Sequence, residues 1–333
     1  MLRHWHRAAR LCGLAKIGAS RLRLFYSGDI HGSERCFRKF LNAASFYQVN
    51  VLILGGDITG KVMVPIVEYE PGRFVANFLG RKEKAKRKHD LEELTKRIRF
   101  NGFYPYECDL EEYERLTNDH AYQAKVMAEV MIAEVRRWMT IADDKLAGRS
   151  VRCFIMPGND DDFGIDDALG SEVVENPEGR VVWVDGYQLL SSAWANPTPW
   201  NSPREADEEQ LGAILDEVAA GLDGQSPSIF NLHVPPFDSG LDTAPELDPD
   251  LRVVTAGGQP LTAPVGSRAV RALIERHQPI VGLHGHIHEC RNVARLGRTL
   301  CINPGSSYGD GVLDGAIVEL EHKKVTRYQL VSG

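Results

Sequence analysis

Gly282-Leu-His-Gly-His-Ile-His288 places three histidines directly after a short apolar run near the C-terminus. The apolar run, residues 279–283, has the length and composition of a buried strand. Alternate side chains of an extended chain face the same way, whereas a tight Gly-His-x-His turn folds two imidazoles toward a common centre. Both geometries gather nitrogen ligands, so this stretch predicts a metal site at the end of a strand.

Similar blocks follow the first two predicted strands. An alternating pattern over residues 21–26 predicts the first strand, and the Gly-Asp-x-His block that follows contains Asp29 and His31. A predicted helix then leads to a wholly apolar strand over residues 49–54, which ends in Gly-Gly-Asp57. Ligands of open α/β sheets bind at the carboxyl ends of strands, so we expect these three side chains to share one site.

Two later apolar runs also end in candidate ligands. The run over residues 151–156 leads into Pro-Gly-Asn159, whose amide oxygen is a neutral ligand. The run over residues 227–232 ends at His233. Carboxylates combined with imidazoles suit Mn, Fe, Zn or Co better than Ca.

The remaining segments indicate one domain with an insertion. Residues 61–118 break the strand and helix rhythm and are predicted to form an inserted cap. Their basic run at 81–88 is a solvated face, an anion-steering patch or a nucleic-acid contact. The Pro- and Gly-rich stretch 235–265 is expected to be a lid or binding loop. We therefore predict a basic N-terminal extension over 1–20 and one domain over 21–333.

Composition narrows the functional classes. The 333 residues are 43% hydrophobic and 26% charged, as is typical of a globular protein with one large core. A formal net charge of −7 gives no general attraction to nucleic acid or to a membrane surface. Six cysteines without a C-x-x-C pair favour reduced thiols and a cytoplasmic location. The basic, acid-free start of the chain leaves an organellar transit peptide as the alternative.

Taken in order, the five blocks resemble the calcineurin-like metallophosphoesterase superfamily, over about residues 22–320 without the insert. The resemblance implies an α/β fold, a four-layer α/β/β/α sandwich, and a cofactor of two divalent metal ions. It assigns Asp29, His31 and His288 to the first metal. It assigns Asn159, His233 and His286 to the second metal, and Asp57 bridges the two.

One position departs from the family pattern. Many members have a histidine directly after the asparagine, credited with protonating the leaving group, whereas this chain has Asp160. A carboxylate beside two dications stays ionised, so we do not expect Asp160 to be the acid. Water or His284 is the candidate substitute. The positions expected to take part in catalysis are Asp57, Asn159, Asp160 and His284.

The function expected from this resemblance is metal-dependent hydrolysis of a phosphate ester by a metal-activated hydroxide. The missing histidine favours a phosphodiester over a monoester. The expected partner is a small-molecule phosphate ester, with neither nucleic acid nor membrane. The alternative is a non-catalytic, metal-binding scaffold or regulatory protein on the same fold, which would not need all seven ligands.

Overall fold

The computed structural model describes residues 21–333. The predicted N-terminal extension and its interpretation as a transit peptide lie outside the described residues.

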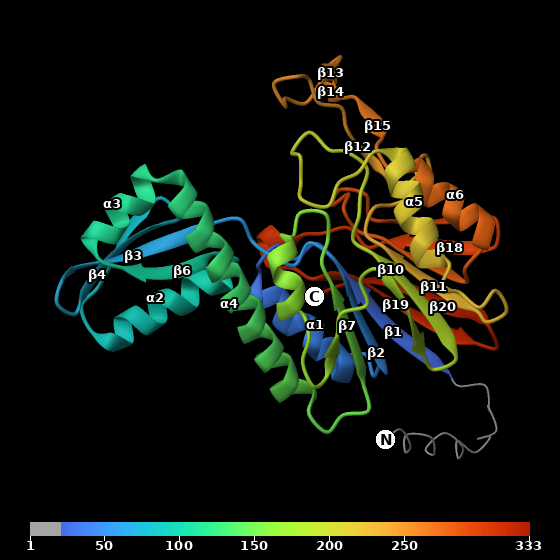
Figure 1. Cartoon of the computed structure of the whole chain (residues 1–333), viewed down its shortest axis with the longest axis horizontal. Helices are drawn as coiled ribbons and strands as arrows, with labels where there is room; N and C mark the ends of the chain where they lie inside the picture. Colours follow the sequence, from blue (N-terminus) through green and yellow to red (C-terminus); the bar gives the residue numbers. More distant parts are fainter. Residues whose placement is uncertain (1–20) are drawn as a thin grey trace, which may run out of the picture.

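Two six-stranded sheets form the centre of the molecule (Figure 1). The first sheet contains, in spatial order, β20 (Lys324–Ser332), β19 (Asp314–Glu321), β1 (Leu22–Ser27), β2 (Val51–Gly55), β7 (Arg152–Met156) and β8 (Val174–Glu175). The second contains β17 (Asn292–Leu296), β18 (Thr299–Asn303), β16 (Val281–Leu283), β11 (Ser228–Leu232), β10 (Tyr187–Ser192) and β9 (Arg180–Val184). The facing sides of the sheets enclose one apolar core, to which Leu24, Phe154 and Leu283 belong.

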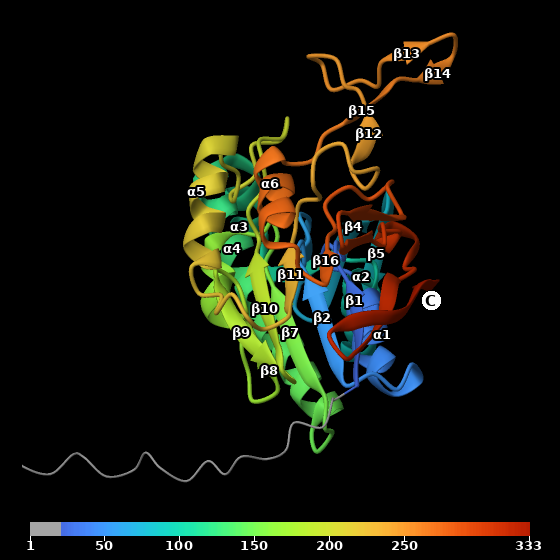
Figure 2. The ribbon, with the colours of Figure 1, turned by 90° about the vertical axis from the view of Figure 1, so that its right-hand side faces the viewer.

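Helices cover the outer face of each sheet. On the first sheet, α1 (Glu34–Phe46) and α4 (His120–Leu146) bury Phe37 and Trp138, whose rings stack with centroids 4.4 Å apart. On the second sheet, α5 (Glu208–Ala219) and α6 (Arg268–His277) pack on a separate apolar cluster (Figure 2). The layers are therefore helix, sheet, sheet and helix, which is the predicted metallophosphoesterase sandwich with an inserted cap.

Strand direction brings the predicted ligand loops together. Strands β1, β2 and β7 run parallel in the first sheet, and β10, β11, β16 and β18 run parallel in the second. Parallel neighbours end at the same edge of a sheet, where the connecting loops form a crevice. The loops that follow β1, β2, β7, β11 and β16 therefore meet at one end of the sandwich.

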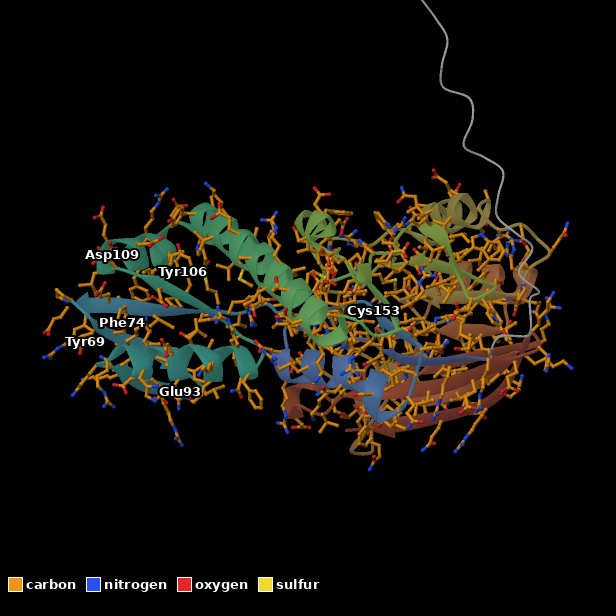
Figure 3. The ribbon with its side chains drawn as sticks, turned by 90° about the horizontal axis from the view of Figure 1, so that it is seen from below. Tyr69, Phe74, Glu93, Tyr106, Asp109 and Cys153 are labelled. Atoms are coloured by element: carbon orange, nitrogen blue, oxygen red, sulfur yellow. The ribbon has the colours of Figure 1, made fainter. Side chains whose placement is uncertain are left out.

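The insertion builds its own small sheet between β2 and α4. Its elements are β3 (Met63–Glu70), β4 (Arg73–Phe78), β5 (Arg81–Ala85), α2 (Lys88–Phe100), β6 (Tyr104–Cys108) and α3 (Leu110–Asn118). Helix α2 packs on one face of this sheet, and α3 with the beginning of α4 packs on the other. Figure 3 shows Glu93 of α2 and Tyr106 of β6 on opposite sides of the cap.

The cap is joined tightly to the body. The phenol oxygen of Tyr104 accepts a hydrogen bond from the Gly60 amide at 2.7 Å. Gly32 and Gly60 lie so close to the carbonyl oxygen of Gly102 that a β-carbon on either glycine would sit within 3 Å of it. The base of the cap therefore packs directly against the loops that follow β1 and β2.

The segment over 235–265 differs in detail from its prediction. The expected loop over 235–265 contains the short strands β12 (Thr243–Pro245), β13 (Thr255–Ala256), β14 (Gln259–Pro260) and β15 (Thr262–Pro264), which form a projecting arm (Figures 1 and 2). Helix α5 begins at Glu208, where Asp207 accepts the Gln210 amide as its N-cap. None of the helices in residues 21–333 has the length and apolar character needed to span a bilayer.

Replacing Phe154 by alanine tests the core between the sheets. The Phe154 side chain is fully buried there, so its truncation leaves a cavity. We expect the free energy of unfolding in urea to fall by about 3–5 kcal/mol. The control is Phe46→Ala, the same truncation on a side chain that is 78% exposed. Equal small losses from both changes would contradict the assignment of Phe154 to the core.

Candidate metal centre

All seven predicted metal ligands lie at the ends of strands and face one another across the sandwich. Asp29 and His31 follow β1, Asp57 follows β2, Asn159 follows β7, His233 follows β11, and His286 and His288 follow β16. An amide from one sheet reaches a carboxylate from the other, because the His286 amide donates to Asp29 Oδ1 at 2.9 Å. The site is therefore built across the edges of both sheets.

Asp29, His31 and His288 form the first group of candidate ligands. The Nε2 atoms of His31 and His288 are 3.2 Å apart. His288 Nε2 is 3.5 Å from Asp29 Oδ1. One carboxylate and two imidazoles therefore aim their ligand atoms at the same small volume.

Asp57, His233 and His286 form the second group, and Asn159 lies within it. The Asn159 Oδ1 atom is 3.0 Å from His233 Nε2 and 2.9 Å from His286 Nδ1. The other nitrogen of His233, Nδ1, is 2.9 Å from the Gly55 carbonyl oxygen. A carbonyl can only accept, so Nδ1 carries a proton and Nε2 is the nitrogen that faces the group.

Asp57 lies between the two groups. Its Oδ2 atom is 3.7 Å from His31 Nε2 in the first group, and its Oδ1 atom is 3.4 Å from His233 Nε2 in the second. Each carboxylate oxygen thus faces a different group. This arrangement is the one that a carboxylate shared by two cations needs.

Four of the seven candidate ligands have an unusual backbone conformation. Asp29, His31, Asp57 and His286 have φ angles of 53°, 38°, 49° and 66°. Non-glycine residues rarely adopt positive φ, and such residues cluster at functional sites. The His286 value shows that the histidine stretch turns after β16 and does not continue as a strand. The side chains of the histidine stretch therefore point in different directions.

Three glycines leave room for the ligand side chains. A β-carbon at Gly285 would overlap the Asp29 carboxylate, and one at Gly158 would overlap the Asp57 carboxylate. A β-carbon at Gly56 would meet the His233 ring. Glycine is thus required at these positions by close approach of the ligands.

The electrostatics favour cations. Burial by itself would raise the pKa values of Asp29 and Asp57, but the histidines beside them hold both below the usual aspartate range. Burial likewise opposes protonation of His233, yet the carboxylates of Asp57 and Asp29 raise its pKa to about 10. Burial and the charge on His233 lower the pKa of His286 to about 4. Two buried carboxylates therefore stay negative and attract positive charge.

The donor set fits divalent transition metals. It offers two carboxylates, four imidazoles and one amide oxygen, the mixture that Mn, Fe, Zn or Co accept. Each carboxylate accepts one backbone amide, from His286 to Asp29 and from Asp160 to Asp57. So much buried acceptor capacity is costly without further compensation, which a cation would supply. On these grounds the residues present fit the implied metal ions.

The structure does not bring His284 to this site. Its side chain is fully buried, with Nδ1 2.9 Å from the Leu232 carbonyl oxygen. Alternation along β16 places His284 on the same side as Gly282, the side that faces α5 and α6. Burial lowers the pKa of His284 to about 4. The ring is therefore neutral and directed away from the ligand groups.

Asp160 lies at the edge of the site, where its carboxylate forms an ion pair with Lys61. Its Oδ1 atom is 2.8 Å from the Lys61 ammonium and 3.1 Å from the Ser202 hydroxyl. Its Oδ2 atom is 3.9 Å from His31 Nδ1. Lys61 also donates to the Asp160 carbonyl oxygen at 2.7 Å. The first residue of the predicted cap is thus fixed beside the candidate ligands.

Sequence reasoning missed two buried residues that support the loops. Asp161 accepts the amides of Ile58 and Gly158 at 3.0 and 2.8 Å, which ties the Asp57 loop to the Asn159 loop. Asn303 donates to the carbonyl oxygens of Gly285 and Ile287 at 3.2 and 3.0 Å. The contact of Asp161 with Ile58 and the contacts of Asn303 join distant segments. The available signals were the place of Asp161 beside Asn159 and the Asn-Pro-Gly-Ser turn that begins at Asn303.

A third missed residue is Tyr308, whose ring lies against two candidate ligands. Its centroid is 4.7 Å from that of His31 and 5.9 Å from that of His288. Burial raises the pKa of its phenol. Tyr308 therefore packs as a neutral side chain against the first group.

Comparison with known proteins places the chain among similar folds, although no protein-family profile matches it. Over 166 residues it is 30% identical to the uncharacterised protein MJ1162 of Methanocaldococcus jannaschii, a match that covers 48% of this chain and 68% of that protein. TT1561 of Thermus thermophilus superposes with a TM-score of 0.53 and 12% identity, over 94% of this chain and 99% of that chain. This likeness supports the fold.

A novel archaeal phosphodiesterase also overlaps 94% of this chain and 100% of its own, with 11% identity. Its TM-score of 0.30 is too low to support any conclusion about this chain.

Gly285→Ala tests whether close approach to Asp29 is needed for metal binding. The new methyl group would displace the Asp29 carboxylate without removing any ligand. We expect Mn²⁺ affinity, measured by isothermal titration calorimetry, to fall by roughly 10–100-fold. Gly170→Ala is the matched control, because a β-carbon there meets nothing within 4 Å. Unchanged affinity in Gly285→Ala, with the fold intact by circular dichroism, would contradict this geometry.

Proposed function

We propose that this chain, which belongs to the same family as the uncharacterised protein MJ1162 of Methanocaldococcus jannaschii, catalyses the metal-dependent hydrolysis of a phosphate ester. One observation carries the proposal. The two oxygens of Asp57 face two separate groups of ligands, at 3.7 Å from His31 and 3.4 Å from His233. A carboxylate placed in this way supports a pair of metal ions held side by side.

The proposed assignment follows the two groups. Asp29, His31 and His288 hold the first ion, Asn159, His233 and His286 hold the second, and Asp57 contacts both. Two bound divalent ions would supply Lewis-acid activation of water and neutralise charge on the phosphate.

The charges of the ligands suit a phosphate substrate. Two ligand carboxylates offset only half of the charge of two divalent ions, because Asn159 and the imidazoles bind as neutral groups. The loaded centre keeps a net positive charge and attracts an anionic ester. In hydrolysis the new bond joins a water oxygen to phosphorus, the ester oxygen leaves, and that oxygen needs positive charge or a proton.

Lys61 is our candidate for stabilising the leaving group. Asp160 occupies the position at which a histidine was expected from the family, and it holds the Lys61 ammonium at 2.8 Å. The lysine side chain is 52% exposed, and ion pairs this exposed add little to stability. Because Lys61 is nevertheless held beside the candidate ligands, its position supports a role in contacting the substrate.

The preferred substrate in this proposal is a small phosphodiester. A diester carries one negative charge and presents two ester oxygens, so its hydrolysis depends less on a dedicated acid when the leaving group is good. Asp160 in place of the histidine favours this class.

Hydrolysis of bis-p-nitrophenyl phosphate by metal-stripped protein resupplied with Mn²⁺ tests the reaction. We expect turnover that depends on metal and exceeds turnover of p-nitrophenyl phosphate. Asp57→Asn should lower kcat by more than the roughly 10–100-fold typical of a residue that only supports a ligand. Asp167→Asn, the same change on an exposed side chain, is the matched control.

Silence on both esters, with two metal ions still bound per chain, would instead favour the non-catalytic scaffold. Preference for the monoester would contradict the proposed phosphodiester substrate but not the proposed hydrolysis reaction.

Lys61→Gln tests the leaving-group role. We expect kcat/KM for a diester with a phenol leaving group to fall by about 10²-fold or more. The loss with p-nitrophenol should be much smaller, because this better leaving group needs less stabilisation. Lys82→Gln, an exposed lysine of the cap, controls for the loss of one positive charge. Equal losses on both leaving groups would argue against the assignment.

A further inference from the structure

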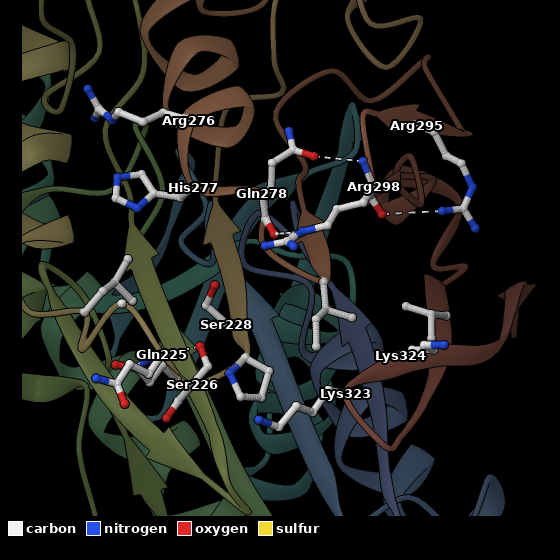
Figure 4. A pocket seen from close by; sticks show the side chains of 16 residues that line it. Gln225, Ser226, Ser228, Arg276, His277, Gln278, Arg295, Arg298, Lys323 and Lys324 are labelled. Carbon is white, nitrogen blue, oxygen red and sulfur yellow. Dashed lines mark hydrogen bonds between the residues drawn. The ribbon is translucent and has the colours of Figure 1, made fainter.

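A cavity of about 760 Å³ lies at the opposite end of the sandwich from the candidate metal centre (Figure 4). Gln188 and Ser228 line it from the first residues of β10 and β11, and Ile280 lines it just before β16. Strands β11 and β16 carry their candidate ligands at their other ends. Ser228 and His233 are five positions apart, which corresponds to roughly 16 Å along an extended strand. The cavity is thus separate from the metal centre.

The cavity is lined by basic side chains from three segments. They are Arg276 in the last turn of α6, Arg295 and Arg298 around the turn between β17 and β18, and Lys323 and Lys324 at the turn between β19 and β20. None of the residues lining it is acidic. This local excess of positive charge contrasts with the net charge of −7 for the whole chain.

Nearby acids do not neutralise most of these cations. Asp216 pairs with Arg276, which turns away from the other cations in Figure 4. Asp223 already accepts bonds from Gln188 Nε2 and from the amide and hydroxyl of Ser226. Within the described part of the chain, no carboxylate pairs with the other four lining cations, Arg295, Arg298, Lys323 and Lys324.

Arg298 is held in place at the wall of the cavity. Its Nε atom donates to the Gln278 carbonyl oxygen at 2.9 Å, and its amide donates to Gln278 Oε1 at 2.8 Å. Gly297 makes room for this contact, because a β-carbon there would overlap the Gln278 side chain. In Figure 4 the guanidinium extends toward the segment that carries Ser228. This cation is therefore pre-positioned.

The turn that carries Lys323 has an unusual conformation. His322 and Lys323 have φ angles of 49° and 63°. A two-residue hairpin turn with positive φ at both positions strongly favours Asn and Gly. The chain uses two larger residues there, and the turn presents Lys323 toward the same segment as Arg298 (Figure 4). Strained backbone conformations of this kind cluster at functional sites.

We infer that this cavity binds a small ligand through a chain of two or more phosphate groups. Its volume falls within the range of small-molecule sites and far exceeds that of one phosphate. Four lining cations without a carboxylate partner, together with the donors of Gln225 and Ser228 elsewhere on the lining, match a run of phosphate oxygens. Among the described residues, His277 has the one aromatic ring that lines the cavity, so phosphate contacts dominate recognition.

The test is calorimetric titration of inorganic triphosphate into metal-stripped protein, in which the metal centre cannot contribute cations. We expect saturable 1:1 binding by the natural protein. Lys323→Gln/Lys324→Gln should weaken it by about tenfold or more. Lys82→Gln/Lys84→Gln is the matched control, because it removes the same charge from the exposed strand β5 of the cap. Arg298→Gln should also weaken binding.

Absence of saturable binding, or equal weakening by the two lysine double variants, would overturn the inference. Thermal melting of each variant separates lost binding from lost folding. A parallel titration with ATP distinguishes two sources of the same chemistry: equal affinities would indicate a free polyphosphate, and tighter binding of ATP a nucleotide. Because metal is absent throughout, failure of the proposed hydrolase function would leave this result unaffected.

Discussion

Two buried carboxylates at one end of the sandwich set the constraint on which the rest of the site depends. Asp29 and Asp57 are almost fully buried, and a buried charge is costly unless it is compensated. The surrounding imidazoles are directed at them at 3.4–3.7 Å. These distances are short enough for charge pairing and arranged around two centres. Bound cations would compensate the carboxylate charge and take the imidazole nitrogens as ligands.

The architecture supplies what this constraint demands. Parallel strands in two sheets end at the same edge, so Asp29 and His286, which are 257 positions apart in the chain, are brought into contact. Positive φ angles at Asp29, Asp57 and His286 then turn each side chain inward from its strand. The close packing of Gly158 and Gly285 against the carboxylates locks that arrangement. Strand direction and local backbone conformation thus position the same ligand side chains.

The sequence predicted the parts of this structure that depend on local pattern. Apolar runs followed by Gly-Asp or Gly-His located β1, β2 and β16, and the run before Pro-Gly-Asn located β7, and hence the ligand loops. It did not locate contacts between distant segments, such as Lys61 with Asp160 or Asp161 with the Ile58 amide. His284 shows the same limit. Its proximity in sequence to two candidate ligands was misleading, because the pleat of β16 directs it toward the helices.

The two ends of the sandwich gather different ionisable groups, and strand β16 runs from one to the other. Strand β16 begins at the cavity lined by Arg298 and leads directly into the loop of His286. The acidic end gathers carboxylates that need cations, whereas the basic end gathers cations without carboxylate partners. An anion bound at one end and metal ions bound at the other would each stabilise the same strand.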